Sequence, residues 1–192
     1  MEFQQIRNFI IFMTLLFILT SNTLNVFHEA YGFFHIGGEQ TSFIPYENTK
    51  LKYNIQYPSN WQKEEHLNDF VTFIAPIVDT SQYKYPAGLG IASMSVGSVS
   101  VDAIKNVHMK NMTNNLKDFK LLESADVVLA DKRPAKKIVF TAMDGEEERK
   151  SLQLITKNND RAYLFTYKAD VDQYDKYFPT IQTMLNSLIF LQ

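Results

Sequence analysis

Apolar and polar residues alternate along the chain in short runs that predict strands. The clearest run, residues 51–57, alternates without a break and predicts a strand with one buried face. Residues 89–96 are also strand-like, but their apolar positions change phase after Ile91, which indicates a bulge. Further strands are predicted over residues 70–74, 119–129, 135–142, 149–156 and 161–169.

Two stretches repeat their apolar residues every three or four positions, as helices do. The first follows Ser100, a side chain suited to capping a helix N-terminus, with Asp102 in its first turn. Because proline breaks a helix interior, we place Pro179 in the first turn of the second helix. The two apolar stripes consist of Val101, Ile104, Val107, Met112 and Leu116, and of Tyr174, Tyr177, Phe178, Ile181, Met184, Leu185 and Leu188.

Turn sequences join several consecutive strands directly. Asp144-Gly145 is a strong hairpin signal, and Asn158-Asn159-Asp160 predicts a second turn. Strands joined by hairpins, with helices appended, predict an antiparallel sheet rather than parallel βαβ units. The predicted fold is therefore α+β, with a central antiparallel sheet of about six or seven strands flanked by helices.

The N-terminal segment predicts export from the cytoplasm. Residues 8–19 are almost all apolar and follow Arg7, as in a secretory signal peptide. Two alternatives remain open, cleavage near Ala30 or retention as an uncleaved membrane anchor. We divide the chain into a signal peptide or anchor (1–30), a tether (31–42) and a folded domain (43–192). We expect the domain to be extracytoplasmic, either secreted or anchored to the outer side of the cytoplasmic membrane.

Composition excludes several kinds of site and partner. The chain has no cysteine, which rules out disulfides, thiolate metal sites and cysteine nucleophiles. Beyond residue 42 it carries 18 basic and 18 acidic side chains, without a dense basic cluster. A domain without a positive field gives no electrostatic basis for binding nucleic acid.

The domain offers little catalytic apparatus. It has two histidines, His66 and His108, and neither a Gly-x-Ser-x-Gly motif nor a phosphate-binding glycine loop. His108 lies at the edge of the first helix's apolar stripe, where a packed structural histidine is expected. We therefore expect no catalytic residues, no bound cofactor and no enzymatic activity.

Two acidic segments are candidates for a divalent cation such as calcium. Four oxygen or nitrogen ligands lie within six residues: Glu64, Glu65, His66 and Asp69. The alternative, which we prefer, is a solvated turn between strands, because the spacing matches no established ligand pattern. Asp144 and residues 146–148 are expected to form an exposed acidic hairpin tip, since they lack the EF-hand pattern.

The long loop over residues 75–88 is a candidate partner contact. Loops of this length in compact domains are often functional. Tyr83 and Tyr85 would supply the large amphipathic contacts that are enriched at interfaces. The alternative is that both tyrosines fold back over the sheet.

One stretch resembles a known family. Tyr53-Asn54-Ile55-Gln56-Tyr57-Pro58-Ser59-Asn60-Trp61 resembles the opening of PsbP-like domains, where a strand ends in a Tyr-Pro-x-x-Trp turn. The later order of strands, helix, hairpin, tyrosine-rich strand and final helix is also similar, over residues 43–191. The resemblance implies an α/β/α sandwich with a central antiparallel sheet. Its best-known members are non-catalytic extrinsic subunits of photosystem II that help to retain calcium and chloride.

These observations lead to one functional expectation and one alternative. We expect an exported accessory or binding module that supports a membrane-associated protein complex, with membrane contact through the N-terminal segment if it is uncleaved. The alternative is an extracytoplasmic carrier of a small ligand or divalent metal that uses the segment from Glu64 to Asp69.

Overall fold

The computed structural model describes residues 42–66, 70–77 and 85–191. Within these ranges it contains two helices and ten strands. In chain order the elements are β1 (Phe43–Asn48), β2 (Tyr53–Pro58), β3 (Gln62–His66), β4 (Phe70–Ile74), β5 (Gly88–Ser95), α2 (Val101–Asn115), β6 (Lys120–Val128), β7 (Pro134–Asp144), β8 (Glu147–Asn158), β9 (Arg161–Asp170), α3 (Val171–Asn186) and β10 (Ile189–Phe190).

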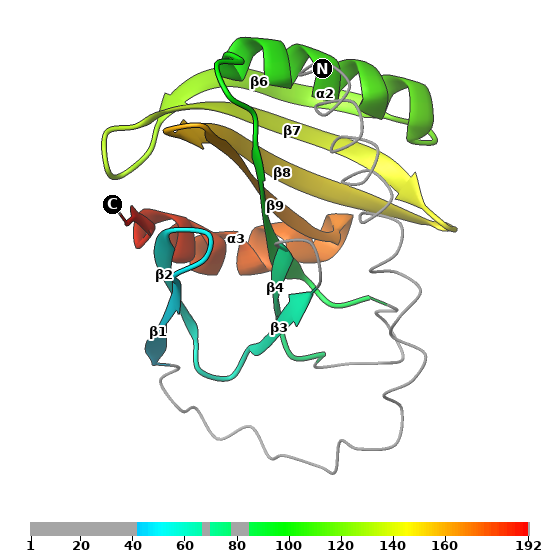
Figure 1. The fold of residues 1–192 in the computed structure, drawn as a ribbon. Coiled ribbons are helices and arrows are strands. Elements are labelled where there is room, and N and C mark those ends of the chain that lie inside the picture. Colours follow the sequence, from blue (N-terminus) through cyan, green and yellow to red (C-terminus); the bar gives the residue numbers. More distant parts are fainter. Residues whose placement is uncertain (1–41, 67–69, 78–84, 192) are drawn as a thin grey trace.

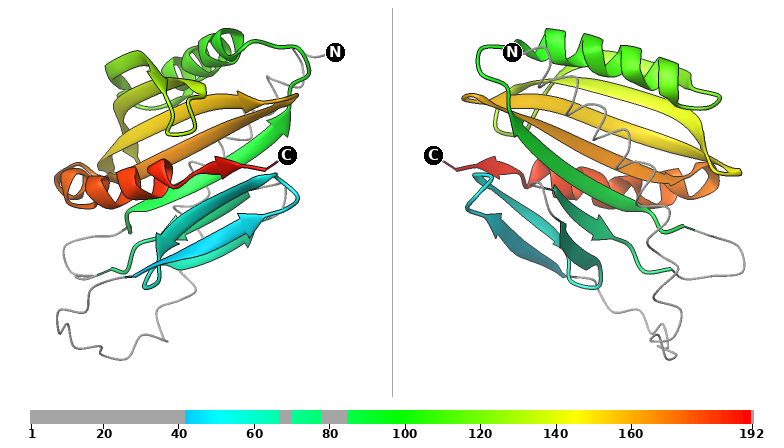
Figure 2. Two further views of the ribbon diagram at one scale, coloured as in Figure 1. Left: turned by 90° about the vertical axis from the view of Figure 1, so that its left-hand side faces the viewer. Right: turned by 45° about the vertical axis from the view of Figure 1, so that its right-hand side comes forward.

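A seven-stranded antiparallel sheet forms the centre of the molecule. Its strand order is β3-β4-β5-β9-β8-β7-β6, and a second sheet has the order β1-β2-β10. Helix α2 packs on β7 and β8, whereas α3 packs on β8, β9 and β2. Figures 1 and 2 show α2 on one face of the large sheet, with α3 and the small sheet on the other. This arrangement confirms the predicted α+β class and the antiparallel sheet flanked by helices.

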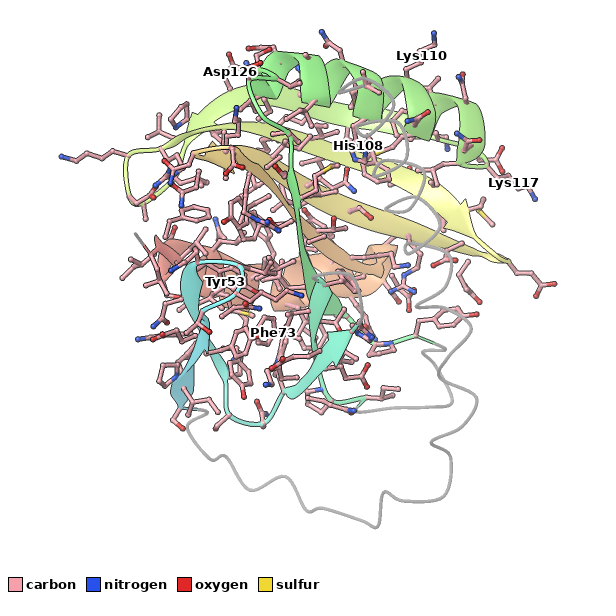
Figure 3. The ribbon with its side chains drawn as sticks, viewed as in Figure 1. Tyr53, Phe73, His108, Lys110, Lys117 and Asp126 are labelled. Atoms are coloured by element: carbon pink, nitrogen blue, oxygen red, sulfur yellow. The ribbon has the colours of Figure 1, made fainter. Side chains whose placement is uncertain are left out.

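Both faces of the large sheet are buried along its central strands, and each face has its own core. On the face toward α2, here called the α2 face, the core includes Phe70, Ala92, Ile104, Met112, Ile138, Phe140, Ile155 and Leu164. The opposite face, called the α3 face, is richer in aromatic residues, including Tyr53, Phe73, Tyr163, Phe165, Tyr167 and Tyr174. Tyr53 and Phe73 lie in this second core between the sheets (Figure 3). Two of its hydroxyls donate to backbone oxygens at 2.7 Å, Tyr163 to Leu51 and Tyr167 to Tyr174.

Helix α2 begins where the sequence predicts. The Ser100 hydroxyl accepts a hydrogen bond from the Ala103 N–H at 3.2 Å, which satisfies one free donor of the first turn. The helix buries Ile104, His108 and Met112 against the sheet. Its predicted apolar face is therefore the packed face.

Strand β5 corrects one prediction, because it has no bulge. Residues 88–95 pair without a register shift with β9, and residues 88–92 do so with β4. Leu89 and Ile91 belong to the core of the α3 face, whereas Ala92 belongs to the core of the α2 face. The change of phase therefore reflects a central strand that is covered on both faces, not an inserted residue.

Helix α3 corrects a second prediction. It begins at Val171, so Pro179 lies inside the helix rather than in its first turn. Proline there removes one backbone hydrogen bond, at a cost of about 3 kcal/mol. Tyr174 before the proline and Ile181 after it are both buried, so tertiary packing on the two sides offsets the local cost.

Several short elements lie outside the sequence prediction. Strands β1, β3 and β10 were not predicted, and β3 occupies the segment that we read as a solvated turn. The Tyr-Pro-x-x-Trp turn is present: the Trp61 N–H donates to the Pro58 oxygen at 2.9 Å, and Trp61 is buried against Tyr177. No helix within the described residues is long and apolar enough to span a membrane.

Candidate functional site

Four charged side chains gather where β7 and β9 end and β8 begins, and we call them the charge cluster: Asp144, Arg149, Lys168 and Asp170. Arg149 on β8 is directly opposite Asp170 on β9. Lys168 lies two residues before Asp170, so strand alternation places it on the same face. Asp144 at the end of β7 completes the cluster through its ion pair with Lys168.

The centre of the cluster is the guanidinium of Arg149, whose side chain is only 1% exposed. Its Nε lies 2.8 Å from the Asp170 carboxylate, but the N–H is not aligned with that oxygen, so the contact is an ion pair rather than a hydrogen bond. Its Nη2 donates to the Pro86 carbonyl oxygen at 3.3 Å. The Tyr85 ring lies beside it, 5.4 Å from centroid to guanidinium carbon.

A second pair lies beside the first. The Lys168 ammonium donates to Asp144 at 2.7 Å, and both side chains are largely buried, 14% and 6% exposed. Burial lowers the pKa of Lys168 to about 8, although Asp144 opposes this effect. Burial likewise lowers the pKa of Arg149 and raises that of Asp170. Burial thus disfavours the charged forms of Lys168, Arg149 and Asp170, while the partner of opposite charge favours them.

The arrangement anchors the end of the long loop to the sheet. Tyr85 and Pro86 are the first residues described after position 84, and Arg149 contacts both of them. The sequence distance between Pro86 and Arg149 is 63 residues, so this contact is set by the tertiary fold. Chemically, two cations and two carboxylates in mutual ion pairs are suited to holding structure in place.

The predicted loop contacts are only partly visible. Tyr85 is half-buried over Arg149, whereas Tyr83 lies outside the described residues. Tyr85 therefore combines the two sequence alternatives, because its ring packs on the domain and still retains exposed surface. Its role as a partner contact stays a prediction.

Strand β3 contains three of the predicted metal ligands and directs them to opposite faces. Alternation puts Glu64 and His66 on one face, where His66 lies 3.6 Å from Glu64 and 2.8 Å from the Thr72 hydroxyl. Glu65 lies on the other face with Lys63, which lowers the pKa of the Glu65 carboxyl through their hydrogen bond. In the described ranges no three His, Cys, Asp or Glu side chains form a metal-type cluster, and Asp69 lies outside those ranges.

His108 is a buried structural histidine. It points from α2 toward the sheet (Figure 3), and its Nε2 lies 2.7 Å from the side-chain oxygen of Gln153 on β8. Gln153 in turn donates to the Thr166 hydroxyl at 3.3 Å. Burial lowers the pKa of His108 below 6.5, so the neutral imidazole is the form that fits this site.

Sequence reasoning missed most of the charge cluster and misjudged one member. Asp144 was expected at an exposed hairpin tip, but it is 7% exposed, and only residues 146–148 of that acidic run are exposed. Gly145, with a φ of 65°, makes the turn directly after it. Arg149 and Lys168 carried no signal, because a charge that alternates with apolar residues resembles a solvent-facing strand position.

Comparison with known proteins places the fold. By fold the chain is similar to CyanoP, the PsbP of Synechocystis sp. PCC 6803, with a TM-score of 0.59 and 16% identity over 81% of this chain and 97% of that one. It is also similar to PA94, a Pseudomonas aeruginosa protein of unknown function (TM-score 0.57, 14% identity, 77% and 96% covered). A third similar structure is LpqN, involved in cell envelope biogenesis of Mycobacterium tuberculosis. Its TM-score is 0.53, with 10% identity over 81% of this chain and 87% of that one.

Sequence comparison gives the family. No curated protein sequence matches the chain. The model of the family described as PsbP-like protein matches residues 37–190, which is most of the chain and nearly the whole folded domain. The resemblance that was carried by the Tyr-Pro-x-x-Trp turn is thereby confirmed, and the chain belongs to the PsbP-like family.

Proposed function

We propose that this chain is an exported, non-catalytic accessory module that supports a membrane-associated protein complex. Membership of the PsbP-like family supports the accessory role. The apolar residues 8–19 behind Arg7 support export, with residues 1–30 as signal peptide or anchor, 31–42 as tether and 43–192 as the extracytoplasmic domain.

In this proposal the partner binds at the loop end marked by Tyr85. The observation that carries it is the anchoring of Tyr85 and Pro86 by the buried Arg149. Burying four charges costs desolvation free energy, and that cost is useful if the segment they hold must keep one conformation. A loop held in its binding conformation loses less conformational entropy when a partner binds. Tyrosine is a common anchor in such interfaces.

Capture of partners from native membranes tests the proposal. The tagged full-length chain is expressed in its native host and purified from the membranes of that host. Proteins that co-purify with it are identified by mass spectrometry. We expect one reproducible membrane complex, with recovery lowered about tenfold by Tyr85→Ala, since tenfold corresponds to about 1.4 kcal/mol. Tyr83→Ala tests the neighbouring tyrosine in the same way.

Two control variants separate the loop from general damage. Tyr85→Phe keeps the ring over Arg149 and should retain the complex, whereas Lys110→Ala changes an exposed position on α2 and should have no effect. Capture of no complex by the unmodified chain would reject the accessory function. The carrier of a small ligand or divalent metal would then become the leading hypothesis.

A further inference from the structure

The two edge strands of the large sheet differ in character. Strand β3 has five residues, all of them polar or charged, whereas β6 has nine. Strand β6 carries three exposed apolar side chains: Leu121 (46%), Leu122 (54%) and Val128 (70%). A long edge strand with exposed apolar residues and unpaired backbone groups is a template for pairing with another strand.

The ladder between β6 and β7 shows which backbone groups face outward. The Leu129 N–H donates to the Arg133 oxygen at 2.8 Å, where the chain turns from β6 into β7. Along an antiparallel strand, the backbone N–H and C=O groups of successive residues point alternately toward and away from the neighbouring strand. Counting back from Leu129, these groups therefore face β7 at every second residue. The residues between them direct their N–H and C=O groups to the outer edge of the sheet, where no strand of the described residues pairs with β6, and these are Ser124, Asp126 and Val128. A register shift lies between Leu121 and Glu123, but residues 123–128 pair one to one with β7.

We propose that β6 pairs antiparallel with β6 of a second copy of this chain, about a two-fold axis at Ala125. The two seven-stranded sheets then form one continuous sheet across the axis. The paired surface is the same on both copies, as a closed two-fold interface requires.

The residues of β6 fit this register. With the axis at Ala125, Leu122, the extra residue at the register shift, comes next to Val128 at the end of β6 of the second copy, so two exposed apolar side chains lie close together. Glu123 lies opposite Val127, and Ser124 lies opposite Asp126. Like charges are not placed opposite one another, which would be unfavourable.

Both neighbouring registers are worse, and the assembly ends at two copies. An axis at Asp126 would place two carboxylates face to face, and an axis at Ser124 would place the apolar Leu122 beside the charged Asp126. In the proposed register each Asp126 keeps its ion pair with Lys136 at 2.9 Å, on the α2 side of β6 (Figure 3). The outer edges of the joined sheet would both be β3, where Lys63, Glu64 and Glu65 discourage further pairing.

Cysteine crosslinking in the full-length chain tests the axis, because the chain has no cysteine of its own. In the proposed register Ala125 meets its counterpart in a non-hydrogen-bonded pair, with the Cα atoms about 4.5 Å apart. That distance is within the range for a disulfide. Ala125→Cys, oxidised mildly in native membranes, should give a disulfide-linked band of twice the chain mass. Glu64→Cys, in the middle of β3, is the matched edge control and should give none.

Charge changes at the exposed positions test the register. In the Ala125→Cys background, the pair Leu122→Lys and Val128→Lys places cations close to each other and should lower the crosslinked yield about fivefold. The pair Leu122→Lys and Val128→Glu should restore it. The proposal is overturned if Ala125→Cys gives no dimer, if Glu64→Cys gives as much, or if the main adduct contains a different protein. Equal yields from both charge pairs would also overturn the register.

Discussion

Replacing Arg149 by methionine tests whether the charge cluster fixes the structure around the loop end. Methionine keeps much of the aliphatic volume of arginine and removes the charge and its donors. In the wild-type chain Arg149 is paired with Asp170 at 2.8 Å and donates to the Pro86 oxygen at 3.3 Å. The variant leaves the Asp170 carboxylate, whose side chain is 14% exposed, without this partner.

The expected loss follows from the burial of the pair. Removing one partner of a buried ion pair costs about 3–5 kcal/mol, because the other charge stays desolvated. Asp170 is not fully buried, so we take the lower end, about 3 kcal/mol. For a domain of this size that loss lowers the melting temperature by about 6–12 °C.

Removing both charges should cost less than removing one. Asp170→Asn alone leaves Arg149 buried without its partner, whereas the double variant Arg149→Met/Asp170→Asn buries two neutral side chains. We expect the free energy of unfolding of the double variant to be about 1–2 kcal/mol higher than that of Arg149→Met alone.

Urea unfolding at pH 7, followed by tryptophan fluorescence, measures these differences through the transition midpoint at constant slope. The single tryptophan, Trp61, is buried in the core of the α3 face and so reports global unfolding. The reasoning is refuted if Arg149→Met costs less than about 1 kcal/mol, or if the two substitutions simply add.

Three further predictions concern His108, Pro179 and strand β3. Because burial lowers the pKa of His108, the folded state binds fewer protons than the unfolded state. The contribution of His108 to the free energy of unfolding should therefore be complete above pH 6.5 and decrease below it. His108→Gln should flatten this pH dependence, measured by urea unfolding between about pH 7.5 and 5. Pro179→Ala should raise the melting temperature by restoring a hydrogen bond within α3, with a gain of about 1–3 kcal/mol, and an unchanged or lower melting temperature would contradict this. Calorimetric titration with zinc, calcium and manganese tests β3: any site should weaken with Glu64→Ala or His66→Ala and be insensitive to Glu65→Ala, which lies on the opposite face.

The sequence pattern predicted the elements that have one buried face or a local capping signal. The alternation over residues 51–57 works because β2 has one packed face, with Tyr53 and Ile55 fully buried. The cap at Ser100 is local chemistry and needed no tertiary knowledge. The central strand β5 was misread because helices and sheets cover both of its faces, which removes the alternation that marks a half-buried strand.

The charge cluster was beyond sequence reasoning for a related cause. Arg149 and Lys168 occupy alternate strand positions that would be exposed in a sheet with one open face. Their burial depends on contacts with residues far away in sequence, such as Pro86, which lies 63 positions from Arg149. Pro179 shows the same limit, since packing of Tyr174 and Ile181 overrides a strong local preference.

A sheet that is covered on both faces has consequences for function. The interior is filled by two cores, so the large sheet's own surface for partners is limited to edges and to the loops at strand ends. The described part of the chain includes a loop end fixed by Arg149 and an apolar edge in β6. These two surfaces involve different residues, so Tyr85→Ala should leave the Ala125→Cys dimer intact. Conversely, the lysine pair at Leu122 and Val128 should leave partner capture through Tyr85 unchanged, unless the complex binds only the dimer.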